Sequence, residues 1–204
     1  MTPVNGFQSF YELSGMEHKR HYHITAQERG SRFLIFTPHG GGIEPGASEL
    51  TRAIAGSDLS CYIFEGVLLE GNDELHITST RFDEPKGLQM IAAADIVVTI
   101  HGCGSRRKKV FVGGLHELLV ERFVSAFQAA GFQAEIGLSP ISGRNPRNIC
   151  NRGKAGKGVQ LEFSEGLRRE LFLSLDRQGR RHTTAAFAEI VTTGRSVLLD
   201  FDTG

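Results

Sequence analysis

The sequence predicts an α/β fold, a single domain with a mixed, mostly parallel sheet and helices on both faces. Short apolar runs of strand length alternate along the chain with segments whose apolar side chains recur at helical spacing. The connections between successive apolar runs are long enough to contain a helix, as parallel strands require. The 204 residues, 40% of them hydrophobic, contain no repeat, linker or low-complexity segment. We therefore expect residues 1–204 to form one domain around one core.

The first part of the chain is predicted to contain two strands and one helix. The apolar run 33–36 predicts a buried strand, and three glycines follow it at 40–42. Apolar side chains near helical spacing predict a helix over 46–55, which Gly56 ends. The apolar run 59–64 predicts a second, short strand.

The middle of the chain continues this alternation. The polar segment 70–81 is ambiguous. Residues 83–93 predict a helix with Pro85 in its first turn, where the fixed backbone angle of proline is favourable. The apolar run 92–100 predicts a strand that is buried on both faces, and 110–114 predicts another strand.

The last part of the chain is predicted to complete the sheet and to end in a helix. Residues 115–130 form a clear amphipathic helical pattern, and a short strand is expected over 132–136. The segment 139–158 is predicted to be a loop. A late strand over 159–163 and a closing helix over 183–199 follow it.

The composition limits the class of protein. The 23 basic and 23 acidic side chains cancel, which removes any net-charge argument for nucleic-acid binding. No apolar segment is long enough for a membrane span, and residues 1–7 lack the basic start and apolar core of a secretory signal. We therefore expect a cytoplasmic monomer without membrane contact. Its three cysteines, an odd number without zinc-finger spacing, are expected to be reduced thiols.

Two predicted strands are each followed by the dipeptide His-Gly. His39 follows the apolar run 33–36, and Glu44 lies five residues farther along the same glycine loop; His101 follows the run 92–100. Because the carboxyl ends of parallel strands meet at one edge of a sheet, we expect these three side chains to lie close together. Neutral imidazole and carboxylate oxygen are zinc ligands, and a water would complete a catalytic tetrahedron. His39, Glu44 and His101 are therefore the predicted ligands of a Zn²⁺ ion.

Glu162 is the candidate general base. It stands near the end of an otherwise apolar predicted strand, where a carboxylate is costly to bury unless it faces a metal, a partner or water. A salt-bridged strand residue is the alternative interpretation, and the nearby Glu165 is a second candidate for the base. A nucleophilic Cys103 beside His101 would need an orienting acid, and none is evident in the sequence.

Basic residues are concentrated next to the candidate site. No acidic residue occurs in 96–116 or in 136–161, the two stretches that contain or border the candidate residues. The first stretch includes four consecutive cations at 106–109. This pattern favours a polyanionic partner, and we expect Arg106 and Arg144 to contact its anionic groups. A solvated run of charges is the alternative interpretation for 106–109.

Several motifs together resemble one protein family. They are Pro38-His39-Gly40-Gly41-Gly42-Ile43-Glu44-Pro45-Gly46, Leu75-His76-Ile77-Thr78-Ser79-Thr80, His101-Gly102, Val112-Gly113-Gly114, Asn148-Ile149-Cys150-Asn151-Arg152-Gly153 and Gly158-Val159-Gln160-Leu161-Glu162. In combination they are similar to the phage-type poly-γ-glutamate hydrolases over roughly residues 10–200. The resemblance implies a zinc carboxypeptidase-like core, a zinc ion held by His39, Glu44 and His101, and Glu162 as the catalytic carboxylate. One departure is the ligand spacing, because zinc carboxypeptidases usually have His-x-x-Glu, whereas four residues separate His39 from Glu44.

The implied reaction is hydrolysis of the γ-glutamyl amide bonds of poly-γ-glutamate by a metal-activated water. Zinc lowers the pKa of a bound water to about 7. Glu162 would take the proton of that water and pass it to the departing amine. Arg152 would stabilise the charge that develops on the carbonyl oxygen. Asn148 and Arg152 are expected to hold a substrate carboxylate, and His76 is expected to orient the substrate.

Two other functions are kept open. The first is a zinc carboxypeptidase-like amidohydrolase that acts on small acylated or γ-glutamyl substrates. The second is a non-enzymatic nucleic-acid-binding protein that uses the same cations without zinc. The chain has no recognition motif, no interleaved aromatic platform and no tryptophan, so we expect an enzyme with no nucleic-acid partner.

Overall fold

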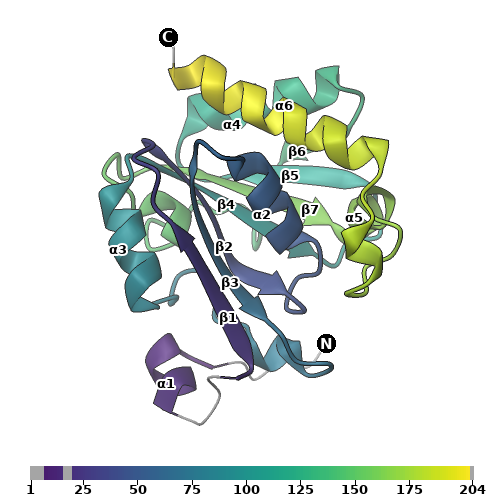
Figure 1. The fold of residues 1–204 in the computed structure, drawn as a ribbon. Coiled ribbons are helices and arrows are strands. Elements are labelled where there is room, and N and C mark those ends of the chain that lie inside the picture. The colour runs from purple at the N-terminus through teal and green to yellow at the C-terminus, as the bar shows by residue number, and fades with distance from the viewer. Residues whose placement is uncertain (1–6, 16–19, 203–204) are drawn as a thin grey trace.

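A central sheet carries the candidate site. The computed structural model describes residues 7–15 and 20–202, and its seven strands pair in the order β1-β3-β2-β4-β7-β5-β6 (Figure 1). The strands are β1 (Tyr22–Gln27), β2 (Phe33–Gly41), β3 (Ser60–Gly66), β4 (Ile96–Cys103), β5 (Lys109–Gly113), β6 (Gln133–Ile136) and β7 (Val159–Ser164). The pairs β2–β3, β2–β4, β4–β7 and β5–β6 are parallel, whereas β1–β3 and β5–β7 are antiparallel. The predicted mixed, mostly parallel sheet is confirmed.

Helices cover both faces of this sheet. The α-helices are α1 (Phe10–Gly15), α2 (Ala47–Ala55), α3 (Pro85–Ala93), α4 (Glu117–Ala129), α5 (Glu165–Leu171) and α6 (Ala185–Asp202), and the short 3-10 helices are η1 (Asn72–Leu75), η2 (Ile149–Asn151) and η3 (Gly179–Arg181). Side chains of β2 alternate between the faces, as strand geometry requires. Phe33 and Ile35 join the core formed with α2, α4, α5 and α6, and Leu34 and Phe36 join the core formed with α3. Among the described residues, no helix has the length and apolar character needed to cross a membrane.

The strands that carry the two histidines are longer than their apolar runs. β2 continues to Gly41 and β4 continues to Cys103, so His39 and His101 lie within strands and not on the loops that follow them. The parallel ladder between β4 and β7 extends through these last residues, which keeps their backbone extended. At its other end β4 begins at Ile96, because α3 continues to Ala93.

Among the strands and α-helices, three elements were not predicted from the sequence. β1 lies at the edge of the sheet and pairs in the antiparallel direction with β3. Its side chains are half-buried or exposed, so the strand shows no apolar run. α1 and α5 have 6 and 7 residues, which is too short for a helical pattern to be visible in the sequence.

The register of the parallel strands determines where the candidate side chains begin. On β4 and β7, His101 is directly paired with Glu162. Since paired residues on neighbouring strands point to the same face, these two side chains leave the sheet side by side. The register between β2 and β3 shifts between Thr37 and Gly40, so the irregularity of β2 coincides with His39.

Candidate metal centre

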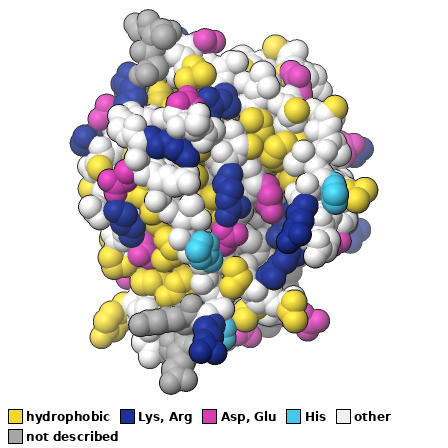
Figure 2. Space-filling model, in the orientation of Figure 1, with side chains coloured by type: hydrophobic (Ala, Val, Ile, Leu, Met, Phe, Trp, Pro, Cys, Tyr) yellow, Lys and Arg dark blue, Asp and Glu magenta, His cyan; other side chains and the backbone are white. Residues whose placement is uncertain are grey.

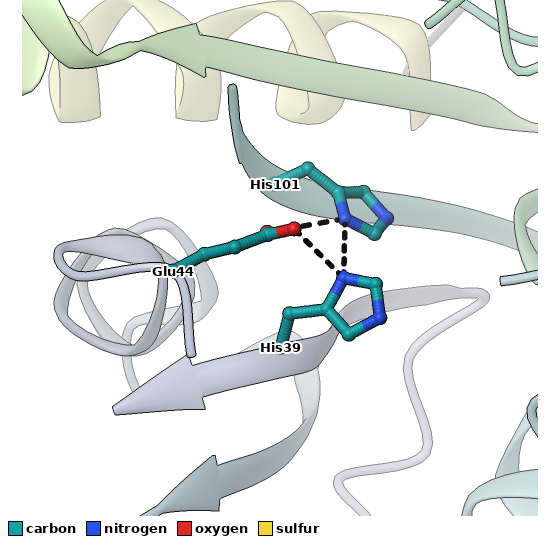
Figure 3. A group of neighbouring side chains, drawn as sticks. All are labelled: His39, Glu44 and His101. Carbon is teal, nitrogen blue, oxygen red and sulfur yellow. Dashed lines mark hydrogen bonds and ion pairs between the residues drawn. The ribbon is translucent and has the colours of Figure 1, made fainter. Parts of the chain in front are cut away.

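Three side chains from two strands and one loop converge at the carboxyl ends of β2 and β4 (Figure 3). Glu44 Oε1 lies 2.9 Å from His39 Nδ1, and Glu44 Oε2 lies 3.3 Å from His101 Nδ1. The two Nδ1 atoms lie 3.1 Å apart. One possible ligand atom from each residue lies within 4.8 Å of the others, so the three residues could hold a metal ion. The predicted convergence of His39, Glu44 and His101 is therefore confirmed.

The outer nitrogens of the two imidazoles are held by the segment after η1. His39 Nε2 lies 2.8 Å from the carbonyl oxygen of Ile77, and His101 Nε2 lies 3.3 Å from Ser79 Oγ. A carbonyl oxygen accepts only, so Nε2 of His39 donates to it, and Nδ1 is the nitrogen of this ring that could bind a metal ion. Such outer contacts fix the tautomer and orientation of metal-binding histidines. The two facing Nδ1 atoms and the carboxylate thus form a donor set that suits a divalent cation.

The glycine loop after β2 brings Glu44 back towards His39. The backbone N–H of Glu44 donates to the carbonyl oxygen of His39 (2.9 Å). Gly41 has a φ of 66°, and a Cβ there would lie 2.2 Å from the carbonyl oxygen of Gly66. Glycine is required at such a position, because other residues rarely adopt this angle and would collide with β3. From the other side, the N–H of Gly102 donates to Glu44 Oε2 (2.8 Å).

The three residues stabilise one another electrostatically. Burial alone would raise the pKa of Glu44, but the charges and hydrogen bonds of His39 and His101 outweigh it and hold the pKa of this carboxyl well below its usual range. Burial opposes the charged form of His101, but the carboxylate of Glu44 outweighs that effect and raises the pKa of His101. Glu44 is therefore an anionic ligand at neutral pH.

Glu162 faces the same cavity as the three possible ligands. The cavity has a volume of about 570 Å³ and is lined by all four of these residues. Burial raises the pKa of Glu162 to about 7. A carboxylate with a pKa near the working pH is suited to accept and return a proton. The alternative base, Glu165, is paired with Arg169 at 2.7 Å and does not line this cavity.

A chain of side-chain amides holds Glu162 in place. Gln160 Nε2 donates to Glu162 Oε1 (2.9 Å), and Asn148 Nδ2 donates to Gln160 Oε1 (2.8 Å). Asn148 Oδ1 accepts from the N–H of Cys150 (3.1 Å). Asn148 lines the cavity, as expected, but its side chain is engaged with the protein on both atoms, so it orients Gln160. Gln160 was missed in the sequence, although its position two residues before Glu162 on one strand places both side chains on the same face.

The other predicted substrate-binding residues differ in their positions. His76 lines the cavity and stacks on His39, with ring centroids 3.8 Å apart. Burial, reinforced by the nearby His39, lowers the pKa of His76 to about 4, so its ring is neutral at pH 7. Arg144 also lines the cavity, and its guanidinium contacts the carboxylate of Glu117 at 3.0 Å.

The structure does not bring Arg106 or Arg152 to the cavity. Both side chains are exposed and neither residue is part of the cavity lining. The guanidinium of Arg152 donates to the carbonyl oxygen of Phe82 (3.3 Å), away from the candidate ligands. The expected position of Arg152 beside the reacting carbonyl is therefore not observed, because the loop that carries it directs the side chain elsewhere.

Comparison with known proteins links the chain to a described family. The family profile described as poly-gamma-glutamate hydrolase matches residues 7–193. Among proteins of Bacillus subtilis (strain 168), the SPbeta prophage-derived UPF0714 protein YoqZ is 41% identical over 179 residues, which are 87% of this chain and 65% of YoqZ. The UPF0714 protein YndL is 39% identical over 84% of this chain and 71% of its own length. The chain thus spans about two thirds of the length of these two relatives.

Solved structures share the whole fold. A bacteriophage poly-gamma-glutamate hydrolase superimposes with a TM-score of 0.93 at 32% identity, covering 97% of this chain and 98% of its own. The zinc-free apo form of YndL gives a TM-score of 0.91 at 36% identity, covering 95% of this chain and 96% of its own. An N-formylglutamate amidohydrolase from Ralstonia eutropha JMP134 gives 0.53 at 10% identity over 89% of this chain and 96% of its own, which shows a shared fold alone.

The raised pKa of Glu162 predicts how the stability of the metal-free protein depends on pH. Folding favours the neutral form of this carboxyl, so its contribution to the free energy of unfolding falls as the pH rises from 4.5 to about 7. The glutamine side chain of the variant Glu162→Gln is neutral at every pH. From pH 4.5 to 7, the free energy of unfolding of this variant should therefore fall by roughly 1–3 kcal/mol less than that of the wild-type protein. Urea unfolding with a chelator between pH 5 and pH 8 measures the difference, with Glu165→Gln as the control at a carboxyl outside the cavity. Parallel pH profiles for the wild-type protein and Glu162→Gln would contradict the raised pKa.

Proposed function

The chain belongs to the poly-γ-glutamate hydrolase family, and we propose that it is a zinc-dependent hydrolase that cleaves the γ-glutamyl amide bonds of poly-γ-glutamate. The observation that carries the proposal is the position of Glu162, a buried carboxyl with a pKa near neutrality, in one cavity with three convergent ligands. The similarity to the bacteriophage enzyme over 97% of the chain supports the choice of substrate. We assign the activity to residues 1–204 as one catalytic domain.

Zinc fits the donor set of the centre. His39 and His101 would bind through Nδ1 and Glu44 through a carboxylate oxygen, and both imidazole nitrogen and carboxylate oxygen are ligands that catalytic zinc sites use. A bound zinc ion supplies a Lewis acid that lowers the pKa of water and polarises a carbonyl oxygen. The Nε2 contacts of both histidines are compatible with this binding, because they turn Nδ1 of each ring towards the other ring and Glu44.

Proton transfer is assigned to Glu162. Its Oε1 is held by Gln160, so we assign Oε2 to the attacking water and to the leaving amine. The carboxylate would accept a proton from the water as the amide carbon is attacked. It would then deliver that proton to the amide nitrogen as the carbon–nitrogen bond breaks. Gln160 and Asn148 contribute by keeping the carboxylate in one orientation throughout these steps.

Substrate carboxylates are assigned to the rim of the cavity. Poly-γ-glutamate carries one free α-carboxylate per residue, and Arg144 is the arginine among the residues that line the cavity. Its contact with Glu117 is exposed and therefore weak, so a substrate carboxylate can replace that partner. His76, neutral and stacked on His39, offers a hydrogen bond close to the scissile amide. Arg106 lies outside the cavity, so it can contact only those residues of a long polymer that lie far from the scissile bond.

The other functions explain fewer observations. A nucleic-acid-binding protein has no need for a buried carboxyl beside three possible metal ligands. On the face shown in Figure 2, Lys and Arg side chains are interspersed with Asp and Glu, without a continuous basic stripe. An amidohydrolase that acts on small substrates would use the same chemistry as the proposed enzyme, and the two functions differ in the length of the substrate. The cytoplasmic location and monomeric state stay predictions from the sequence.

Two substitutions separate metal binding from proton transfer. His39→Ala should lose zinc and hydrolysis together, because it removes a ligand. Glu162→Gln should retain zinc and lose roughly 10²- to 10⁴-fold in kcat, because an amide cannot act as the base. Metal analysis of the dialysed proteins and the rate of shortening of poly-γ-glutamate measure the two effects. Full activity of Glu162→Gln would exclude Glu162 as the base, and a zinc-free but active His39→Ala would exclude the proposed centre.

The position of Arg144 predicts a specific loss of substrate binding. Arg144→Ala should raise the KM for poly-γ-glutamate by about 3- to 10-fold with little change in kcat, since a charge-assisted contact at an exposed rim is modest. Arg106→Ala is the matched control, because it removes an exposed arginine outside the cavity. Initial rates over a range of polymer concentrations give both constants. Equal effects of the two substitutions would remove the special role of Arg144.

A further inference from the structure

Arg168 is a buried arginine on α5 that none of the steps above uses. The residue is 5% exposed and is not part of the cavity lining. Within residues 7–15 and 20–202, no carboxylate lies within ion-pair distance of its guanidinium. Burying a charged group is costly unless it is well bonded, so the contacts that hold Arg168 are informative.

The guanidinium of Arg168 donates three hydrogen bonds to backbone carbonyl oxygens. Nε donates to Phe163 (3.0 Å), Nη1 donates to Pro45 (2.5 Å) and Nη2 donates to Cys103 (3.1 Å). These three carbonyls come from β7, from the glycine loop after β2, and from the last residue of β4. One rigid group therefore connects three segments that are far apart in the sequence.

Each of these segments carries one residue of the proposed site. The carbonyl on the glycine loop comes directly after Glu44, the carbonyl on β7 comes directly after Glu162, and the carbonyl on β4 comes two residues after His101. A guanidinium presents its donors in a fixed planar fork, so the three acceptors are held at a fixed spacing. The single nitrogen of a lysine cannot reproduce this geometry.

The backbone of β4 leaves room for the guanidinium. A Cβ at Gly102 would lie 2.7 Å from Arg168 Cζ, which is closer than a real Cβ contact. The N–H of the same glycine donates to Glu44 Oε2. Gly102 thus packs against Arg168 and orients Glu44. Because a side chain at this position would collide with Arg168, the packing explains why a glycine follows His101.

The positive charge of Arg168, like its hydrogen bonds, stabilises the arrangement of the site. Glu44 and Glu162 lie close together and largely out of solvent, where their ionised forms repel one another. A fixed cation near both favours the ionised forms, and the two carboxylates in turn favour the charged guanidinium. Burial, by contrast, lowers the pKa of Arg168.

We propose that Arg168 is a positioning residue that fixes the spacing of Glu44, His101 and Glu162 for metal binding and proton transfer. The part that concerns proton transfer rests on the function proposed above. The part that concerns metal binding needs no substrate. Failure of the proposed function can therefore be told apart from failure of this inference.

Zinc affinity in two variants tests the inference. Arg168→Met and Arg168→Lys are compared with the wild-type protein by competition with a chromophoric chelator, well below the unfolding temperature. Both variants should bind zinc roughly 10- to 100-fold more weakly, as expected when groups that orient metal ligands are lost. The visible spectrum of the cobalt(II)-loaded variants should also differ from that of the wild-type protein. With saturating zinc, kcat on poly-γ-glutamate should fall while KM stays nearly unchanged, because Arg168 does not line the cavity.

Arg169→Met and Arg169→Lys are the matched controls. Arg169 is the next residue on α5, but its side chain is exposed and pairs with Glu165. These controls should keep wild-type zinc affinity, cobalt spectrum and kcat. Wild-type zinc affinity in Arg168→Lys would overturn the inference, because a lysine keeps the charge without the three-way contact. This variant decides the question even if Arg168→Met does not fold. If the wild-type protein binds zinc but leaves poly-γ-glutamate intact, the proposed function fails and the zinc comparison still tests Arg168.

Discussion

The parallel pairing of β2, β4 and β7 is the constraint on which the site depends. It brings three strand ends that are distant in the sequence to one edge of the sheet, where the register pairs His101 with Glu162. The glycine loop after β2 then returns Glu44 to the gap between the two histidines. Neither histidine has to reach out on a long loop, so the positions of the ligands are set by backbone hydrogen bonds of the sheet.

The polar groups of the site are arranged in two layers. The outer layer consists of neutral contacts, such as those of His39 with Ile77 and of Glu162 with Gln160, which satisfy buried donors and fix ring and carboxylate orientations. The inner layer leaves two imidazole nitrogens and a carboxylate facing one another. This division explains how a site can be rigid and still offer lone pairs to a cation. A rigid, preorganised site is what metal-assisted hydrolysis requires.

The sequence was sufficient for the fold class, the possible metal ligands and the position of Glu162, because buried parallel strands are visible as apolar runs and their ends define the site. It was not sufficient for the supporting contacts. Ile77 contacts His39 through its backbone carbonyl. Every residue has such a group, so this contact cannot be recognised from the sequence. Gln160 could have been found from its two-residue spacing to Glu162 on one strand. The positions of Arg106 and Arg152 could not have been predicted from the sequence, since a local excess of cations does not determine the direction in which a loop side chain points.

Hydrolysis of poly-γ-glutamate in the cavity beside β2, β4 and β7 depends, in this proposal, on a metal held by His39, Glu44 and His101. The size distribution of high-molecular-weight poly-γ-glutamate tests this dependence after incubation with the purified protein alone, with chelator, and with chelator followed by zinc. We expect the protein to shorten the polymer, the chelator to stop the shortening and zinc to restore it. Polymer that stays intact in the presence of zinc-loaded protein would rule out the proposed hydrolysis, and shortening that a chelator leaves unchanged would rule out the metal.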